Sequence, residues 1–327
     1  MYFIKIRSCP IIKSIIFASL FEKINYVIFP QPSWRICSAS DSFFRTITAL
    51  ANEKASKKIG SLSLNIIRMF LAIFLLSFYN LIARGHFLPV DANLHNWLWL
   101  SLSGLVGFTF GDYFLFRAYA EIGSRFSMLI MTTVPLFTAF LGWVFIGEKL
   151  RFLHFAGMML TFIGISLAIF SRNGKGEKLT LKFAPTGILL ALGGALGQAT
   201  GLILSKIGMA GTYDPFAATQ IRVIAGGFGF ALLATFISHW PEVIEGARNR
   251  EAVTAVTIGA VFGPFIGVSF SLMAVKYTQA GIASTIMAIV PVLIIPPSVY
   301  LNKEKVTLAE VAGAVISVAG VALFFTG

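Results

Sequence analysis

The feature that most constrains this chain is an internal repeat. Residues 107–170 align without a gap with residues 263–326, so that adding 156 to a position number in the first segment gives its counterpart in the second. Fourteen of the 64 aligned positions are identical, and most residues at the others are apolar. Repetition at a fixed offset indicates one structural unit that occurs twice, and duplicated apolar units are typical of secondary transporters.

The apolar content places both units in a membrane. Hydrophobic residues make up 57% of the chain and charged residues 12%, which leaves too few polar side chains to cover a soluble domain. A bilayer core of about 30 Å requires about 20 apolar residues per helix, so the chain has room for about ten spans. The sequence therefore predicts a polytopic membrane protein.

Nine apolar runs are bounded by charged or turn-forming residues. They are continuous rather than alternating, which excludes a β-barrel, and helices satisfy every backbone group in lipid. The predicted helical spans are residues 62–83, 97–120, 126–146, 152–171, 183–207, 215–240, 252–275, 281–301 and 307–326.

The tenth span is the difficult one. Extending the repeat upstream places residues 35–54 opposite the glycine-rich span at residues 187–206. Residues 35–54 contain Arg35, Asp41 and Arg45, and each such charge costs about 2.5–3.5 kcal/mol at the centre of a membrane helix. Two interpretations stay open for residues 1–42: a divergent first helix, or a segment produced by a misplaced start or a shifted reading frame. The second is preferred.

The resulting division has four parts. Residues 1–42 form an atypical N-terminal segment, residues 43–171 a first repeat, residues 172–182 a basic linker and residues 183–327 a second repeat.

A set of short motifs recurs in both repeats. The first has glycines at 107 and 111, Asp112, Phe116 and Ala118, then Val134-Pro135, Glu148-Lys149, Ala156-Gly157 and Gly164; the second keeps Gly263, Gly267, Ala274, Val290-Pro291, Glu304-Lys305, Ala312-Gly313 and Gly320. This pattern resembles the EamA-type units of the drug/metabolite transporter superfamily. The sequence departs from that pattern in its first helix and at Val268, which stands where the first repeat has Asp112.

The resemblance implies an all-α membrane protein with about ten transmembrane helices in two inverted five-helix repeats. It also implies a secondary transporter, an exporter or permease of small metabolites such as amino acids, with alternating access around a central cavity. An odd number of spans per unit independently inverts the second unit in the bilayer. The alternative is a non-transporting membrane scaffold or an inactive, degenerate transporter.

Small residues recur every fourth position in several spans. Residues four apart share one helix face, where glycines allow close approach of a neighbouring backbone. We interpret these glycines as helix-packing residues, with contact to substrate as the alternative: Gly107, Gly111, Gly263, Gly267, Gly193, Gly197 and Gly201. Pro135 and Pro291 lie about ten residues into their spans, where a proline removes a backbone hydrogen bond and kinks the helix, either as a gate or as a static bend.

Polar side chains within the spans are the candidates for substrate binding or coupling, because burying them in lipid is costly. They are Asp112, Arg68, Arg222, Arg117 and Gln198. Our hypothesis is that Asp112 pairs with an arginine across the cavity or takes up a proton during the cycle. Arg68 and Arg222 occupy matching positions in the two units, and the alternative for them is that their guanidinium groups snorkel to the membrane surface.

Signatures of other protein classes are missing from the sequence. The four histidines are widely spaced, no Cys/His cluster suits a metal and no phosphate-binding loop occurs, so we expect no enzyme, no cofactor and no metal. The net charge of +12 is attributed to the loops rather than to nucleic-acid binding. The expected partners are a small-molecule metabolite, the lipid bilayer and protons, in a monomer or weak homodimer of the bacterial inner membrane.

Overall fold

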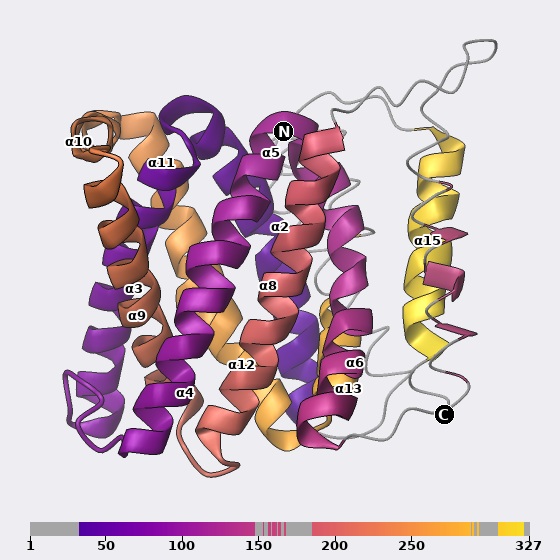
Figure 1. Cartoon of the computed structure of the whole chain (residues 1–327), viewed down its shortest axis with the longest axis horizontal. Helices are drawn as coiled ribbons and strands as arrows, with labels where there is room; N and C mark the ends of the chain where they lie inside the picture. The colour runs from indigo at the N-terminus through magenta and orange to yellow at the C-terminus, as the bar shows by residue number, and fades with distance from the viewer. Residues whose placement is uncertain are drawn as a thin grey trace, which may run out of the picture.

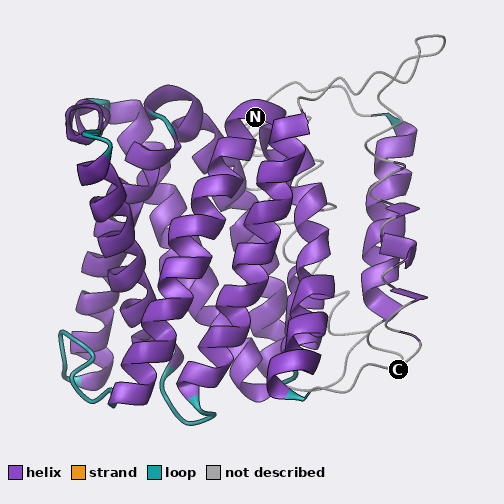
Figure 2. Cartoon of the chain, viewed as in Figure 1, coloured by secondary structure: helices purple, strands orange, loops and turns teal. Residues whose placement is uncertain are grey.

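The computed structural model describes residues 33–147, individual positions between 153 and 167, residues 185–288, 290 and 293, and residues 307–323. Every regular element in this part of the chain is a helix (Figure 2). The elements are α2 (Ser33–Ile59), α3 (Ser61–Arg84), α4 (Leu94–Gly104), η2 (Leu105–Asp112), α5 (Tyr113–Ile130), η3 (Met131–Thr133), α6 (Val134–Ile146), α8 (Pro185–Met209), α9 (Pro215–Phe236), α10 (Trp240–Arg248), α11 (Arg250–Ala260), η4 (Val261–Gly267), α12 (Val268–Tyr277), α13 (Ala280–Met287) and α15 (Leu308–Ala322).

Six helical segments among the described residues are long and apolar enough to cross a bilayer, and each matches a predicted span. They are Ser61–Arg84, Leu94–Ser124, Phe126–Ile146, Pro185–Met209, Pro215–Phe236 and Arg250–Tyr277. The predicted span at 307–326 contains a shorter apolar stretch, Val311–Gly320. Most of the predicted spans 152–171 and 281–301 lies outside the described residues, as do Glu148-Lys149, the basic linker and Pro291.

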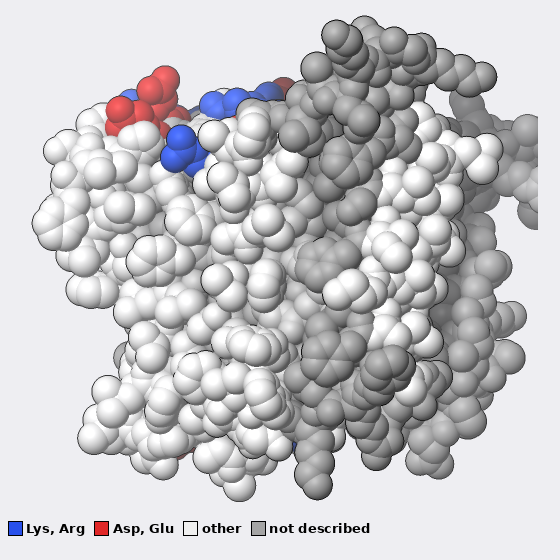
Figure 3. Space-filling model, turned by 45° about the vertical axis from the view of Figure 1, so that its right-hand side comes forward, with Lys and Arg blue, Asp and Glu red and all other residues white. Residues whose placement is uncertain are grey.

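The outer surface of the bundle is apolar. Phe70, Phe74 and Phe78 follow one another at four-residue spacing along α3 and are 73%, 63% and 57% exposed. Such a row of exposed aromatic side chains suits contact with lipid rather than with water. Figure 3 shows a broad uncharged surface on the side of the bundle that it views, with the visible charged side chains gathered mainly at one end. The chain is therefore a multi-pass membrane protein.

The helices of the two predicted repeats are interleaved (Figure 1). Helix α8, from the second repeat, packs against α4, η2, α5 and α6 of the first. Helix α2, from the first repeat, packs in turn against α11, η4, α12 and α13 of the second, and α3 packs against α9. Each repeat thus buries its leading helix in the opposite one.

Helix α2 begins at Ser33, so the boundary predicted at residue 43 falls within it. The helix holds polar side chains because protein surrounds it: Thr48 and Asn52 are buried, and the Arg45 guanidinium donates to Ser271 Oγ at 3.1 Å. The free-energy cost that the sequence analysis assigned to Arg45 applies to a charge at the centre of a helix that faces lipid. A helix enclosed by neighbours can satisfy such a group instead.

Two π-helical segments lie at corresponding positions in the repeats, and the sequence did not predict them. They are η2, which begins at Leu105, and η4, which begins at Val261 and contains Pro264. The repeat offset of 156 maps Leu105 onto Val261. A π-helical turn is wider than an α-helical one and frequently occurs at functional sites.

The predicted glycine positions form close helix contacts. A Cβ atom added to Gly197 would lie 2.7 Å from Gly111 Cα, and one added to Gly201 would lie 2.9 Å from Gly107 Cα. Both distances leave no room for a side chain, so α8 and η2 meet backbone to backbone. The remaining positions differ: Gly193 faces the Phe114 ring, Gly263 faces Thr48 and Gly267 is buried within η4.

The predicted kink at Pro135 takes the form of a change of helix type. Helix α5 ends at Ile130, the short 3₁₀ segment η3 follows, and Pro135 lies in the first turn of α6. Proline is well tolerated there because the first turn of a helix needs no intrahelical donor. This helix break, the 3₁₀ segment η3, therefore lies within the span at 126–146, between the end of α5 and the start of α6.

Residues at equivalent positions of the two repeats also contact each other, and those of the second repeat lie in α15. Thr161 Oγ1 donates to the Ser317 carbonyl at 3.3 Å, and Ser317 Oγ donates to the Thr161 carbonyl at 3.4 Å. A Cβ atom on Gly164 would lie 2.6 Å from the Gly313 carbonyl oxygen, and one on Gly320 would lie 2.7 Å from the Gly157 carbonyl oxygen. Each of these contacts therefore has a counterpart between the repeat-equivalent residues.

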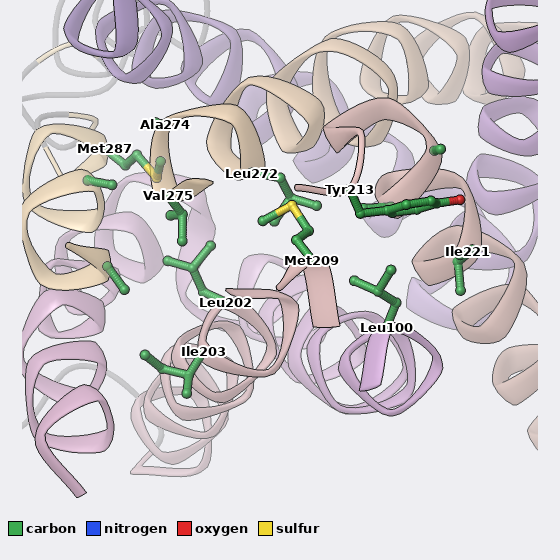
Figure 4. Close-up of a cluster of buried hydrophobic side chains, with 14 residues drawn as sticks. Leu100, Leu202, Ile203, Met209, Tyr213, Ile221, Leu272, Ala274, Val275 and Met287 are labelled. Atoms are coloured by element: carbon green, nitrogen blue, oxygen red, sulfur yellow. The ribbon is translucent and has the colours of Figure 1, made fainter. Parts of the chain in front are cut away.

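A hydrophobic cluster fills the junction of α8, α9, α12 and α13 (Figure 4). Leu202 and Ile203 enter it from α8, and Leu272 and Val275 enter it from α12. Met287 joins the cluster from α13. The cluster fixes the positions of these helices next to the polar residues described below.

Candidate functional site

Asp112 lies at the end of η2 and is held by two other helices. Its carboxylate forms an ion pair with Arg68 of α3 and accepts a hydrogen bond from Gln198 Nε2 of α8, with 2.6 Å between Nε2 and Oδ1. The Arg68 and Asp112 side chains are 4% and 6% exposed. The fold thus brings together three of the five polar residues selected from the sequence.

Further contacts fix the Arg68 guanidinium. It donates to Asn65 Oδ1 at 3.1 Å and lies over the Phe116 ring, 4.5 Å from the ring centroid. Cation–π contact and a buried ion pair together compensate the charge that the helix interior would otherwise disfavour. Arg68 is therefore held by three neighbours, Asp112, Asn65 and Phe116, rather than directed to the surface.

Arg222 is the repeat-related arginine, and its environment differs. Its side chain is buried, lies over the Phe108 ring at 5.0 Å and approaches Gly107 of η2. Among the described side chains no carboxylate forms an ion pair with it, because the position that matches Asp112 is Val268. Neither Arg68 nor Arg222 snorkels, since only 3% of each residue is exposed.

Arg117 was selected from the sequence but lies outside this group. Its side chain is 56% exposed, and its Nε atom lies 3.7 Å from the Glu121 carboxylate one helical turn away. Both residues are on α5, and the residue before Arg117, Phe116, points in another direction, towards Arg68. The sequence alone does not show which residues of α5 are covered by other helices, so it could not distinguish exposed Arg117 from a buried site residue.

A small pocket, called the cavity below, lies beside the Asp112 group. It lies between α2, α5, η3, α6, α8 and α13, and its lining residues are Arg45, Met128, Met131, Thr132, Val134, Gln198, Leu202, Ser284, Met287, Ala288 and Val290. Gln198 is the direct link: its side chain lines the cavity and donates to Asp112. Met131 and Val134 place the cavity next to the helix break before Pro135.

Several lining residues were missed from the sequence. Arg45 was considered there only as a charge unfavourable to a membrane helix, and the methionines at 128, 131 and 287 look like ordinary core residues. The repeat did contain a signal for Arg45, because its counterpart in the other unit is Gly197, a packing glycine. An arginine aligned with a glycine marks a position at which the two repeats differ in size and charge.

The site contains no arrangement suited to a metal in the described part of the chain. Groups of three or more histidine, cysteine, aspartate or glutamate residues that could hold an ion are missing there. The side chains that line the cavity offer charge, hydrogen bonding and apolar contact.

The chain matches known membrane proteins over most of its length. The model of the EamA-like transporter family matches residues 33–170 and 185–326, so the first match starts where α2 begins. "Uncharacterized transporter YvbV" of Bacillus subtilis (strain 168) is 25% identical over 195 residues, which span 59% of this chain and 60% of that relative. "Uncharacterized transporter YdfC" of the same organism is 24% identical over 232 residues, or 67% of this chain and 68% of the relative.

One solved structure, titled "Crystal structure of protein", superposes with a TM-score of 0.63 and covers 90% of this chain and 96% of its own. Its identity of 19% shows a shared fold alone. The family match, in contrast, spans both repeats and the helices that carry Arg68, Asp112 and Gln198. The chain belongs to the EamA-like transporter family.

Proposed function

We propose that the protein is a secondary carrier, an exporter or permease of small metabolites such as amino acids. It works by alternating access, with ten helices in two inverted repeats around the cavity beside Asp112. The observation that carries this proposal is the position of Gln198, which joins the cavity to the buried ion pair. A solute that enters the cavity would contact Gln198, whose amide already donates to the Asp112 carboxylate.

The contacts beside α15 support the inverted arrangement. Gly164 approaches Gly313 and Gly320 approaches Gly157, so the later residue of each segment meets the earlier residue of the other. Two equivalent helices with such contacts run antiparallel, and reciprocal contacts of this kind are the signature of two-fold symmetry. Equivalent helices that run antiparallel are what inverted-topology repeats require.

The Asp112 group is the proposed element that switches the protein between two states. Arg68, Asp112 and Gln198 come from α3, η2 and α8, so a change at the carboxylate alters contacts among three helices. Protonation of Asp112 would remove the charge that holds Arg68. A solute that competes for Gln198 would likewise favour one arrangement over another, since a ligand shifts populations by its differential affinity.

The break before Pro135 is the proposed gate. Met131 of η3 and Val134 of α6 both line the cavity, so rotation of α6 about this break would change the cavity's opening. Hinges of this kind are a few residues at element ends that absorb the backbone change.

Transport is tested with purified full-length protein in proteoliposomes. Vesicles loaded with one unlabelled metabolite at a time, amino acids first, are placed in a trace of the labelled compound, and counterflow is followed. A carrier gives transient, saturable accumulation that protein-free vesicles lack. A scaffold gives none for any compound, and that result with correctly inserted protein would reject the proposal.

A further inference from the structure

We infer that Arg222 is the second ion-pair partner of Asp112. The carboxylate pairs with Arg68 in this structure and with Arg222 in the opposite conformation of the carrier. This inference rests on the proposed function and completes its switching element. Arg222 is a positioning residue in this scheme, because it acts on the helices through Asp112 rather than on the solute.

Two aromatic rings flank Asp112 along its helix, and each holds one arginine. Phe108 lies four residues before Asp112 and Phe116 four residues after it, and both rings are buried. The Arg68 guanidinium lies over Phe116 at 4.5 Å from the ring centroid, and the Arg222 guanidinium lies over Phe108 at 5.0 Å. One carboxylate therefore has a ring-held guanidinium one turn away in each direction.

Arg222 is close enough to act on Asp112. A Cβ atom added to Gly107 would lie 3.0 Å from Arg222 Nη2. Gly107 and Asp112 are five residues apart in the π-helical segment η2, and five residues is the hydrogen-bond spacing of a π-helix. Asp112 interacts electrostatically with Arg222. The Arg222 guanidinium thus lies about one turn of η2 from the carboxylate.

The two arginines occupy equivalent places in the two repeats. Arg222 approaches Gly107 of the first repeat, and Arg68 approaches Gly263 of the second, with 3.9 Å between Arg68 Nη1 and a Cβ atom added to Gly263. Gly107 and Gly263 are themselves equivalent positions. Val268 stands where the second repeat would have its own carboxylate. Two equivalent cations therefore share Asp112.

Arg222 has no anionic partner among the described side chains. It is 3% exposed, and its buried Nε atom has no hydrogen-bond partner in the described part of the chain. A buried guanidinium without an anion is unfavourable, so pairing with Asp112 would stabilise it. Arg68 would then keep its contacts with Asn65 and Phe116.

The exchange leaves one paired and one ring-held arginine in each conformation. Separation of α3 from η2 without a second partner would leave the Asp112 charge less compensated, which disfavours that conformation. With Arg222 as the replacement, the two conformations remain close in free energy. A carrier that visits both conformations needs this balance, because a ligand shifts the equilibrium only by its differential affinity.

The pairing is tested by unfolding midpoints of the full chain in detergent. Asp112→Asn, Arg222→Gln and their combination are compared in the native background and in the Arg68→Gln background. In the native background the two losses should be nearly additive, because Arg68 holds the carboxylate. In the Arg68→Gln background Asp112 should turn to Arg222, so the two losses should become strongly non-additive.

Arg117→Gln is the matched control for Arg222→Gln. It removes an exposed arginine that lies outside the Asp112 group, so it should be additive with Asp112→Asn in both backgrounds. Equal additivity of Arg222→Gln in both backgrounds would overturn the inference. If the Arg68→Gln protein does not fold, the transport measurement on Arg222→Gln decides, since that variant retains Arg68.

Arg222→Gln separates transport from stability. The substitution removes a buried charge that has no anion in this structure, so the variant should unfold at no lower a temperature than the native protein. Counterflow in proteoliposomes should fall by at least about tenfold, the factor for one charge-assisted contact. Arg222→Lys keeps the charge and should retain more of the flux. Native flux in Arg222→Gln, or a midpoint and flux that fall together, would contradict the exchange.

The outcomes also distinguish this inference from the carrier proposal, because the unfolding cycles need no solute. Counterflow by the native protein with additive losses in both backgrounds leaves the carrier proposal standing and rejects Arg222 as the second partner. Non-additivity confined to the Arg68→Gln background, with no counterflow by the native protein for any solute, rejects the carrier proposal and retains the pairing of Asp112 with Arg222.

Discussion

Arg68 and Asp112 form a buried ion pair that joins α3 to the end of the π-helical segment η2. The carboxylate also accepts from Gln198, so three helices meet at one side chain. A buried pair of this kind adds little net stability over an apolar pair, but removing one partner leaves an uncompensated charge.

Asp112→Asn should destabilise the protein by about 3–5 kcal/mol, the usual cost of breaking one partner of a buried ion pair. Transport should be lost, because Arg68 then has no anion to hold. The measurements are the thermal unfolding midpoint in detergent and counterflow in proteoliposomes. Normal flux through correctly inserted Asp112→Asn protein would remove Asp112 from the mechanism.

The double variant Arg68→Gln/Asp112→Asn should unfold at a higher temperature than Asp112→Asn alone, since neither charge is then left unpaired. The coupling between contacting residues in such cycles is commonly 0.5–3 kcal/mol in magnitude, about the range expected here. Strictly additive losses would show that the two side chains do not depend on each other, contrary to the ion pair.

Gln198→Leu should reduce transport more than it reduces stability. The substitution removes the hydrogen bond to Asp112, worth about 1.5–3 kcal/mol for a charged acceptor, and changes the cavity wall at the same time. Thr200→Ala is the matched control on the same helix, because the Thr200 hydroxyl is exposed and bonds only within its own turn to the Leu196 carbonyl. Equal flux in the two variants would contradict a role for Gln198.

Gly197→Ala should destabilise the contact between α8 and η2 by about 1–3 kcal/mol, because the added methyl group meets backbone rather than a movable side chain. The Cβ atom would lie 2.7 Å from Gly111 Cα. Gly227→Ala is the control, since its Cβ would lie 3.5 Å from Met69 Cβ, an ordinary contact. Unfolding midpoints that fall equally in both variants would argue against backbone contact at Gly197.

Gly164→Ala and Gly320→Ala should lower the unfolding midpoint by similar amounts. Each added Cβ would approach a backbone oxygen of the opposite segment, at 2.6 and 2.7 Å. Both residues occupy the same place in their repeats, so a two-fold contact predicts equal losses. A large loss for one residue and none for the other would show that the two halves do not pack symmetrically there.

Much of the fold could be predicted from local sequence, because hydrophobicity and repetition are properties of short segments. Six of the predicted spans are confirmed as long apolar helices, and the EamA resemblance is confirmed by a family match over both repeats. The glycines at 107, 111, 197 and 201 were selected from spacing alone, and they lie at backbone contacts between helices. Four-residue spacing identifies a face, and small residues on a face allow close approach.

The site could be predicted only in part. The cost of a charge in lipid singled out Asp112, Arg68 and Arg222, but it singled out Arg117 equally, and only the fold shows that Arg117 is exposed. The same reasoning treated Arg45 as evidence against a membrane-spanning helix at residues 35–54. In the structure Arg45 lines the cavity, because α2 is enclosed by helices of the other repeat.

The sequence by itself determined that this is a membrane protein made of two related units, because hydropathy and repetition act residue by residue along the chain. Tertiary structure decided which buried charges meet. The pairing of Arg68 with Asp112, the link through Gln198 and the position of Arg45 depend on helices far apart in the sequence. Packing within the first repeat brings Arg68 to Asp112, whereas packing between the repeats brings Gln198 to Asp112 and Arg45 to Ser271. The electrostatic energy of a buried charge depends on these neighbours in space.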